Sequence, residues 1–322
     1  ERPVEALLSG PAASVMGMMA LMPSCSEDTL VLDMGGTTTD IALLAAGQPV
    51  LSPDDLVVNG RSTLVRALKS VSIGLGGDSQ VTVAPGIQVG PLRKGPALAF
   101  GGTDGPTFLD CLNVLGHADA GDVAASRAGV ESLAAAHGLS AESLSQEVLD
   151  CARSRVASAV RSLLDEVNSR PVYTLAALLE ERAVRPARAV LVGGPAEAVA
   201  PLLGDALGLP VETLGDPVLG PVANAIGAAL TRPTASLDLF ADTAAGMLLV
   251  PSLDIRKPIT RRYTLEEAKA EACALLRGQV AFASASPEID VTEAQLFATL
   301  DEYGRGGRDI RVRCQLRPGV ER

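Results

Sequence analysis

Short apolar runs separated by turn residues predict β-hairpins in the first third of the chain. Two such runs flank a glycine-rich turn within residues 29–46, which predicts one hairpin there. A second hairpin is predicted over residues 80–89, around Ala84-Pro85-Gly86. Glycine is frequent throughout residues 57–116, which indicates either backbone that approaches another group closely or an irregular connector.

Helical periodicity dominates residues 123–183. Apolar residues recur there every three or four positions, the spacing of one helix face, at Leu144, Val148, Ala152, Val156, Ala159, Leu163 and Val167. Charged residues fill the other side, so we expect a helix packed on a core. Shorter helices of small residues are expected at 12–21 and 224–230.

A different alternation follows this helical segment. An apolar strand at 189–192 precedes Gly193-Gly194, a helix at 196–207 and a further strand at 208–211. Strand, glycine pair, helix and strand is the order of a doubly wound sheet. We therefore expect an α/β fold for residues 1–234.

The remaining residues, 235–322, predict a small α+β module that begins near Thr234. Residues 246–255 and 309–316 are β-like. Between them, Thr264 with Glu267 and Thr292 with Gln295 have the spacing of a capping box, so each predicts the start of a helix.

Composition and charge exclude several classes of protein. The chain has 322 residues, of which 47% are hydrophobic but 2% aromatic, so the core must consist mainly of Ala, Val and Leu. The net charge of −11 argues against a nucleic-acid partner, which needs clustered Lys and Arg. No apolar run approaches the length of a membrane span. The 5 cysteines are scattered and unpaired in spacing, which favours reduced thiols in a cytoplasmic protein.

The segment Asp33-Met-Gly-Gly-Thr-Thr-Thr-Asp40 is the first candidate for chemistry. Glycines in such a turn let backbone N–H groups point inward and form an anion nest, to which threonine hydroxyls add donors. Asp33, at the end of a strand, is well placed to hold a hydrated Mg²⁺, which takes few protein carboxylates. The alternative is a hairpin without a ligand.

A second glycine pair occurs in Val190-Leu-Val-Gly-Gly-Pro195. A strand that ends in Gly-Gly before a helix can pass its backbone against a nucleoside, and the helix N-terminus favours negative charge. The sequence contains no GxxxxGK[ST] loop, and Gly74-Leu-Gly-Gly-Asp-Ser79 lacks the GxGxxG spacing.

These two motifs, in this order, resemble the ATPase fold shared by actin, sugar kinases and heat-shock chaperones. More narrowly, the sequence resembles the hydantoinase/oxoprolinase A-type family. The matching segments are 9–13, 33–41, 72–79, 89–91, 100–102, 106–107 and 223–229. The resemblance implies an actin-like, ribonuclease H-like lobe over residues 1–234, with its phosphate-loop hairpin at 29–46, a helical insertion at 123–183 and an adenosine turn at 189–230. Residues 235–322 resemble the C-terminal segment of the same family more weakly.

The resemblance also implies a function and a site. Members of the family use ATP to activate cyclic amides such as hydantoin and 5-oxoproline by phosphorylating a carbonyl oxygen, and relatives are carboxylase subunits. The implied cofactors are ATP and Mg²⁺, and the implied partners are a small cyclic amide or carbonyl substrate and a second, B-type subunit. Asp33 and Asp40 would hold Mg²⁺, and Asp33 and Asp78 would be catalytic. The implied nucleotide contacts are Gly35, Gly36, Thr37, Thr38, Thr39, Gly76, Gly77, Gly193, Gly194 and Asn224.

Two departures from the family pattern affect these expectations. Complete members carry an earlier DxGGTxTD loop, and this sequence has one such motif. We therefore expect a chain that lacks the first phosphate loop and that, alone, binds ATP weakly at best and does not turn it over. Many members have Gly-Gly-Gly-Ser where this chain has Gly76-Gly77-Asp78-Ser79, so Asp78 is either a substrate or metal contact or an Asx-turn residue. The alternative function is a non-catalytic ATPase module that switches or reactivates a partner protein, or a carboxylase subunit.

Overall fold

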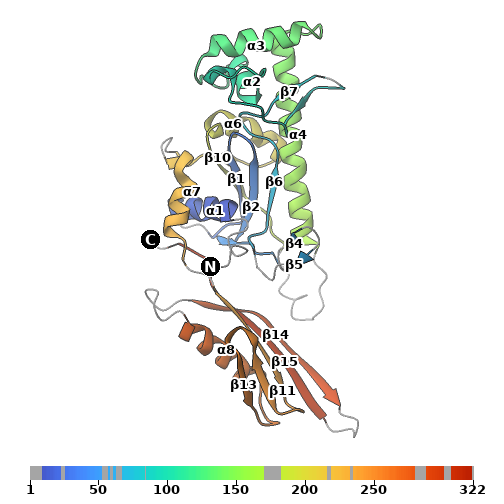
Figure 1. Ribbon diagram of the computed structural model, residues 1–322, viewed down its shortest axis with the longest axis vertical. Helices are drawn as coiled ribbons and strands as arrows, with labels where there is room; N and C mark the ends of the chain where they lie inside the picture. The colour runs from blue at the N-terminus through green and yellow to red at the C-terminus, as the bar shows by residue number, and fades with distance from the viewer. Residues whose placement is uncertain are drawn as a thin grey trace. The chain divides into compact units, whose positions relative to one another are not determined.

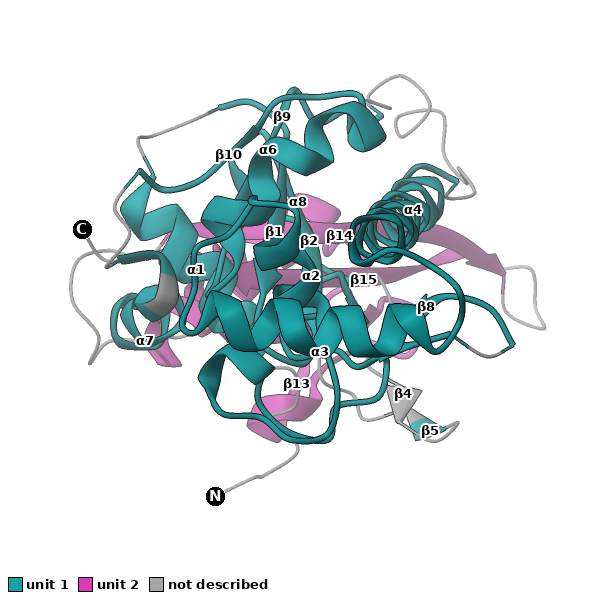
Figure 2. Cartoon of the chain, turned by 90° about the horizontal axis from the view of Figure 1, so that it is seen from above, with its two compact units in different colours: residues 1–231, 320–322 teal, residues 232–319 magenta. Residues whose placement is uncertain are grey.

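The computed structural model of the chain describes residues 9–22, 26–52, 57–58, 61–62, 67–83, 85–169, 183–215, 219–232, 235–279, 288–300 and 306–320. The chain divides into two compact units, residues 1–231 with 320–322 and residues 232–319 (Figure 2). The boundary expected at Thr234 lies outside the described residues. Each unit has a hydrophobic cluster of its own.

A six-stranded sheet forms the centre of the first unit. Its order is β10 (Val211–Glu212), β9 (Arg188–Val192), β1 (Thr29–Met34), β2 (Thr39–Ala45) and β3 (Gln48–Pro49), and β6 (Ser70–Ile73) also pairs with β2. β9 runs parallel to β1 and β10, whereas β2 runs antiparallel to β1. The hairpin predicted over 29–46 and the α/β fold are therefore confirmed.

Two short ladders lie outside this sheet. β4 (Val57–Val58) pairs with β5 (Arg61–Ser62), and β7 (Val81–Thr82) pairs with β8 (Gln88–Val89). The second pair confirms the hairpin predicted over residues 80–89.

Apolar side chains alternate along the central strands, so both faces of the sheet are apolar and a different set of helices covers each. Leu30, Leu32 and Met34 of β1 point to the larger cluster, which includes residues of α4 (Ala141–Asn168) and α6 (Ala196–Leu207). Val31 of β1 points to the other face, which α1 (Ser9–Leu21) covers. The sheet is thus sandwiched between α1 and α4, as Figure 2 shows.

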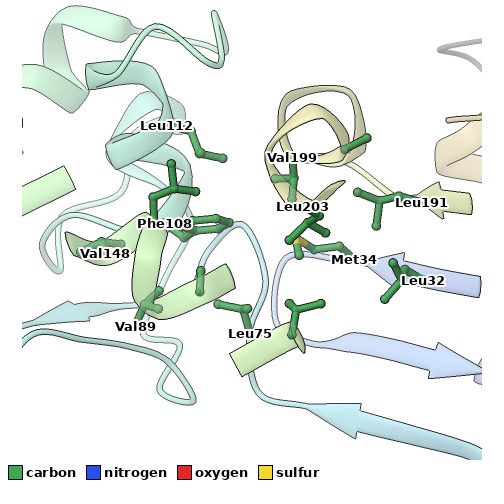
Figure 3. Packing of buried hydrophobic residues seen from close by; sticks show 14 of the residues in the cluster. Leu32, Met34, Leu75, Val89, Phe108, Leu112, Val148, Leu191, Val199 and Leu203 are labelled. Atoms are coloured by element: carbon green, nitrogen blue, oxygen red, sulfur yellow. The ribbon is translucent and has the colours of Figure 1, made fainter. Parts of the chain in front are cut away.

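The larger cluster continues beyond the sheet into α2 (Phe108–Val114) and α3 (Val123–Ala135). Figure 3 shows Leu75, Phe108 and Leu112 packed with residues of the sheet and of α6. The stripe predicted along residues 144–167 lies in α4 and is buried apart from Ala159, which is half-buried. Residues 170–182 of the predicted helical segment lie outside the described residues.

Glycines bring α1 and α7 (Leu219–Leu230) into very close contact. A β-carbon at Gly17 would lie 1.8 Å from the carbonyl oxygen of Ala223, and one at Gly227 would lie 1.8 Å from that of Ala13. The two helices are neighbours in Figure 1. Their small residues, predicted as helical from the sequence, are therefore the contact surface itself.

In its described residues the second unit has a five-stranded antiparallel sheet and one α-helix, α8 (Leu265–Gln279). The order is β13 (Ile255–Pro258), β12 (Met247–Val250), β11 (Ser236–Asp242), β15 (Gly306–Leu316) and β14 (Ile289–Leu300), and a 3₁₀ helix spans Pro251–Leu253. The capping box predicted at Thr264 is present: Thr264 N–H donates to Glu267 Oε2 at 2.7 Å, and Glu267 N–H donates to Thr264 Oγ1 at 3.2 Å.

One local prediction is wrong, and another has the wrong bounds. The spacing of Thr292 and Gln295 predicts a helix, but both lie in β14, which pairs with β15 from Ile289 to Leu300. Long-range strand pairing overrides a local capping signal here. The strand predicted at 208–211 is present as β10 but begins only at Val211, because Gly208 adopts a left-handed conformation (φ 68°) and ends α6.

None of the helices in the described ranges combines the length and apolar character needed to cross a bilayer. Within those ranges Cys111, Cys151, Cys273 and Cys314 are free thiols, as expected, and Cys25 lies outside them.

Replacing Gly227 with alanine is expected to lower the free energy of unfolding by about 1–3 kcal/mol, because the added methyl overlaps backbone of α1. Gly220 of the same helix has no atom within 4 Å of its β-carbon position, so Gly220→Ala is the matched control. It is expected to leave stability unchanged or to raise it by up to about 1 kcal/mol. Urea denaturation followed by circular dichroism measures both, and equal effects would contradict the close crossing.

Candidate functional site

Three glycine-containing turns meet where β1 and β9 end. The two strands are parallel, and Asp33 pairs with Val192, so their carboxyl ends are level. The hairpin turn 35–38 follows β1, and Gly193–Pro195 follows β9. The third turn, residues 74–79, follows β6. The carboxyl edge of parallel strands is where ligands bind in open α/β sheets.

The turn after β9 requires glycine at one position and leaves space at the next. Gly193 has φ 105°, and a β-carbon there would lie 2.1 Å from the carbonyl oxygen of Met34. Gly194 is exposed, and its β-carbon position has no atom within 4 Å. Gly193 therefore serves the fold, whereas Gly194 borders open space, as a residue that contacts a ligand would.

The third turn is fastened to the hairpin turn through backbone. Gly77 N–H donates to the carbonyl oxygen of Gly35 at 2.9 Å, and Asp78 N–H donates to that of Gly36 at 2.7 Å. A β-carbon at Gly76 would lie 2.5 Å from the Gly35 carbonyl oxygen, so this approach requires glycine. The β-carbon position of Gly77 is 3.8 Å from Pro195 Cγ, which brings the turn after β9 into the same cluster.

Backbone donors remain available at the tip of the hairpin. Gly35 N–H donates to the carbonyl oxygen of Thr38 at 2.9 Å. Within the described part of the chain, the N–H groups of Gly36, Thr37 and Thr38 donate to no other residue. The Thr37 and Thr38 side chains are exposed. These groups together have the chemistry of an anion nest.

Thr39 does not join this set through its side chain. Its hydroxyl is fully buried and donates to the carbonyl oxygen of Leu75 at 2.7 Å. The reason is strand alternation: Thr39 pairs with Met34, whose side chain faces the larger cluster, whereas Asp40 faces the opposite way.

Asp33 lies on the α1 side of the sheet, at the centre of a short hydrogen-bond chain. Ser14 Oγ donates to Asp33 Oδ2 at 2.5 Å, and Asn224 Nδ2 donates to Ser14 Oγ at 3.1 Å and to the carbonyl oxygen of Gly10 at 3.0 Å. Burial raises the pKa of Asp33 above its ordinary value of 3.8, the bond from Ser14 lowers it, and the charge of Asp40 raises it. The carboxylate is thus held in place but disfavoured as an anion.

Asp33 and Asp40 suit a divalent cation. They stand opposite each other in the hairpin register, and each is half-buried. Mg²⁺ binds one or two carboxylates and keeps several waters. No cluster of three or more His, Cys, Asp or Glu side chains that could hold a metal occurs in the described residues. A cation between these two carboxylates would therefore take its other ligands from water or from a bound phosphate.

Asp78 is paired with a cation of the chain itself. Its Oδ2 lies 2.8 Å from Arg93 Nη2, and its Oδ1 accepts from Ala97 N–H at 3.2 Å. An Asx turn would use the N–H of Gln80, which donates to the carbonyl oxygen of Leu92 instead, so that reading of Asp78 is wrong.

Ser14 and Arg93 lie at the site although the sequence analysis did not predict them as site residues. Ser14 lies one residue beyond the Ser9–Ala13 motif, and the only available signal was its place near the start of a small-residue helix. Arg93 follows the Val89-Gly-Pro91 motif, and its role depends on a contact with Thr37 across 56 positions. Neither contact has a local sequence pattern.

Comparison with known proteins gives a family and a fold. No curated protein matches the sequence. The ATP-dependent caprolactamase from Pseudomonas jessenii matches with a TM-score of 0.66 and 19% identity, over 98% of this chain and 50% of that one. Nucleotide-free acetone carboxylase matches with a TM-score of 0.58 and 17% identity, over 98% and 50%. An archaeal actin homologue is matched over 67% of this chain and 52% of that chain, with a TM-score of 0.32 and 13% identity.

The chain thus spans about half the length of the caprolactamase and the carboxylase. The family described as hydantoinase/oxoprolinase matches residues 1–236, which include the hairpin turn, the third turn and the turn after β9. By this match the chain belongs to the hydantoinase/oxoprolinase family.

Proposed function

We propose that this chain is the ATP-binding part of an enzyme that activates a cyclic amide, such as hydantoin or 5-oxoproline, or a related carbonyl compound. The observation that carries the proposal is the meeting of three glycine turns around Asp33 in a member of this family. Bound ATP would supply a phosphoryl group that converts an unreactive carbonyl oxygen into part of a leaving group.

The residues of the chain would mainly bind and orient the nucleotide. The free N–H groups of the hairpin tip, with the hydroxyls of Thr37 and Thr38, would hold phosphate oxygens. Gly194 would leave room for the nucleoside. Such phosphoryl transfer depends on positioning and charge neutralisation, which a backbone cradle and a cation can provide.

The raised pKa of Asp33 supports its assignment to Mg²⁺. A carboxylate that burial and a like charge disfavour gains from a bound cation, because the cation offsets both effects. Ser14 fixes its orientation, as hydrogen-bond partners of metal ligands commonly do. Asp40 would share the same ion.

We place the enzyme in the reducing cytoplasm, which the free cysteines of the described residues fit. We also propose that it acts with a second, B-type subunit, as the family resemblance implies. Neither point affects the chemistry assigned to the turns.

Phosphate release is the experiment that tests the function. The chain, and any longer natural protein that contains it, would be incubated with Mg·ATP and hydantoin, 5-oxoproline, caprolactam, or acetone with bicarbonate. Phosphate release stimulated by one of these compounds supports the proposal and identifies the substrate class. Stimulation by a partner protein alone, with no response to any small molecule, would contradict it and favour a switching ATPase.

Asp33→Asn is expected to weaken Mg²⁺-dependent ATP binding at least about 100-fold, the upper end of what loss of a ligand's hydrogen-bond partner costs. Ser14→Ala, which removes that partner, should give a smaller loss. Titration calorimetry measures both, and Asp205→Asn, at a fully exposed carboxylate, is the control. Equal affinity of Asp33→Asn and the unchanged chain would remove Asp33 from the site.

The Asp33→Asn variant is also expected to be more stable than the unchanged chain at neutral pH without ligand. Between 3.8 and the raised pKa, the folded chain keeps the Asp33 proton that the unfolded chain has lost. The folded state therefore binds more protons, and the free energy of unfolding falls as pH rises through this interval. The substitution removes this fall, so the advantage of the variant should grow between pH 3.8 and the raised pKa, stay constant above it, and vanish below 3.8. Urea unfolding at several pH values measures this, and a difference independent of pH would contradict the shift.

Gly194→Val is expected to leave folding unchanged and to weaken ATP binding about 10-fold or more, because its side chain fills space open to a ligand. Gly86→Val, at an equally open glycine between β7 and β8, is the control. Thermal unfolding checks the fold and calorimetry the affinity. If the Gly194→Val variant folds and binds ATP as tightly as the unchanged chain, Gly193-Gly194 is only a turn between a strand and a helix.

A further inference from the structure

The side chain of Arg93 lies against the tip of the phosphate-loop hairpin. Its Nη1 donates to Thr37 Oγ1 at 3.2 Å, and its Nη2 lies 3.9 Å from the β-carbon position of Gly36. The backbone beneath it is fixed, since Gln80 N–H donates to the carbonyl oxygen of Leu92 at 2.8 Å and Gly90 N–H to that of Gln80 at 3.0 Å. The guanidinium is therefore presented at this turn by an anchored loop.

Asp78 orients that guanidinium. Its Oδ2 is 2.8 Å from Arg93 Nη2, and its Oδ1 is held by Ala97 N–H. The Asp78 side chain is 17% exposed, whereas that of Arg93 is 46% exposed, so one end of the pair is held in the protein and the other faces solvent. The absence of a side chain at Gly36 makes this possible, because a β-carbon there would lie 2.5 Å from Asp78 Oδ2.

Arg93 retains donors for a ligand. A guanidinium has five N–H donors. Asp78 and Thr37 engage Nη2 and Nη1, and the described residues supply no partner for the others. Beside it are the N–H groups of Gly36, Thr37 and Thr38, which donate to no residue of the described ranges. An oriented guanidinium next to free backbone donors is a strong combination for binding phosphate.

A role in stability alone does not explain why Arg93 and Asp78 pair beside the hairpin tip. An ion pair with an exposed partner contributes little to stability. The pair instead offsets the charge of Asp78, which would otherwise repel a phosphate at the hairpin tip. It also gives Asp78 a cationic partner, which Asp33 lacks among the described residues.

We infer that Arg93 binds the phosphate chain of the nucleotide at the hairpin tip, and that Asp78 is a positioning residue that holds Arg93 there. This rests on the proposed function. It changes the role expected for Asp78, whose carboxylate acts through Arg93 rather than on the reacting atoms.

Affinity measurements test this role. Arg93→Gln is expected to weaken binding of ATP and of pyrophosphate about 10- to 100-fold, the effect of losing a charged hydrogen bond. Arg93→Lys, which keeps the charge, should recover part of the loss. Asp78→Asn in the Arg93→Gln background should cost nothing further, because Asp78 acts through Arg93. Arg127→Gln is the matched control, since Arg127 is 45% exposed and pairs with Glu142 at 3.0 Å on a different part of the unit.

Chemical protection gives a readout that a structural role would not move. Phenylglyoxal modifies exposed arginines, and peptide mass spectrometry follows Arg93 and Arg127 in the same sample. ATP or pyrophosphate should protect Arg93 and leave Arg127 reactive.

The two proposals fail in different ways. If neither the unchanged chain nor a longer natural protein that contains it binds ATP or pyrophosphate, the proposed function and this inference are both overturned. If either binds them but Arg93 stays reactive and Arg93→Gln binds as tightly, the role of Arg93 alone is overturned.

Discussion

Direct approach of backbone to backbone is the constraint on which the site depends. The third turn reaches the hairpin because residue 76 has no side chain, and the turn after β9 reaches β1 because residue 193 has none. Any β-carbon at either place would overlap a carbonyl group. The third turn supplies the donors of the hydrogen bonds that join the two turns, so the N–H groups of Gly36, Thr37 and Thr38 keep no partner among the described residues. The three turns can therefore come together only because these glycines have no side chain.

The site treats its carboxylates in opposite ways. Asp78 is neutralised by an arginine of the chain, whereas Asp33 receives, among the described residues, a single hydroxyl donor and stands opposite a second carboxylate. The first arrangement is complete in the free protein. The second leaves excess negative charge at the end of a strand, which a bound cation would balance.

Local patterns in the sequence predicted the elements well where the signal and the structure are both local. The hairpin at 29–46 and the helix at 196–207 follow from apolar runs and glycine punctuation. The prediction of a helix from Thr292 was wrong because that segment pairs with β15, and a local pattern gives no information about such a partner strand. For the site, the glycines could be found from the sequence but their separate roles could not. Which of two adjacent glycines is needed for φ and which faces open space depends on the neighbouring strand.

The close crossing of α1 and α7 has a consequence for biosynthesis. Asn224 and Ser14, which meet at this crossing, are 210 positions apart in the chain. At ordinary translation rates the later residue follows the earlier one by roughly 10 to 40 s. During that interval α1 has no partner for its small-residue face, and Ser14 has no amide to hold it beside Asp33. The nascent chain therefore completes this side of the sheet late, and the glycines then admit α7 in one register.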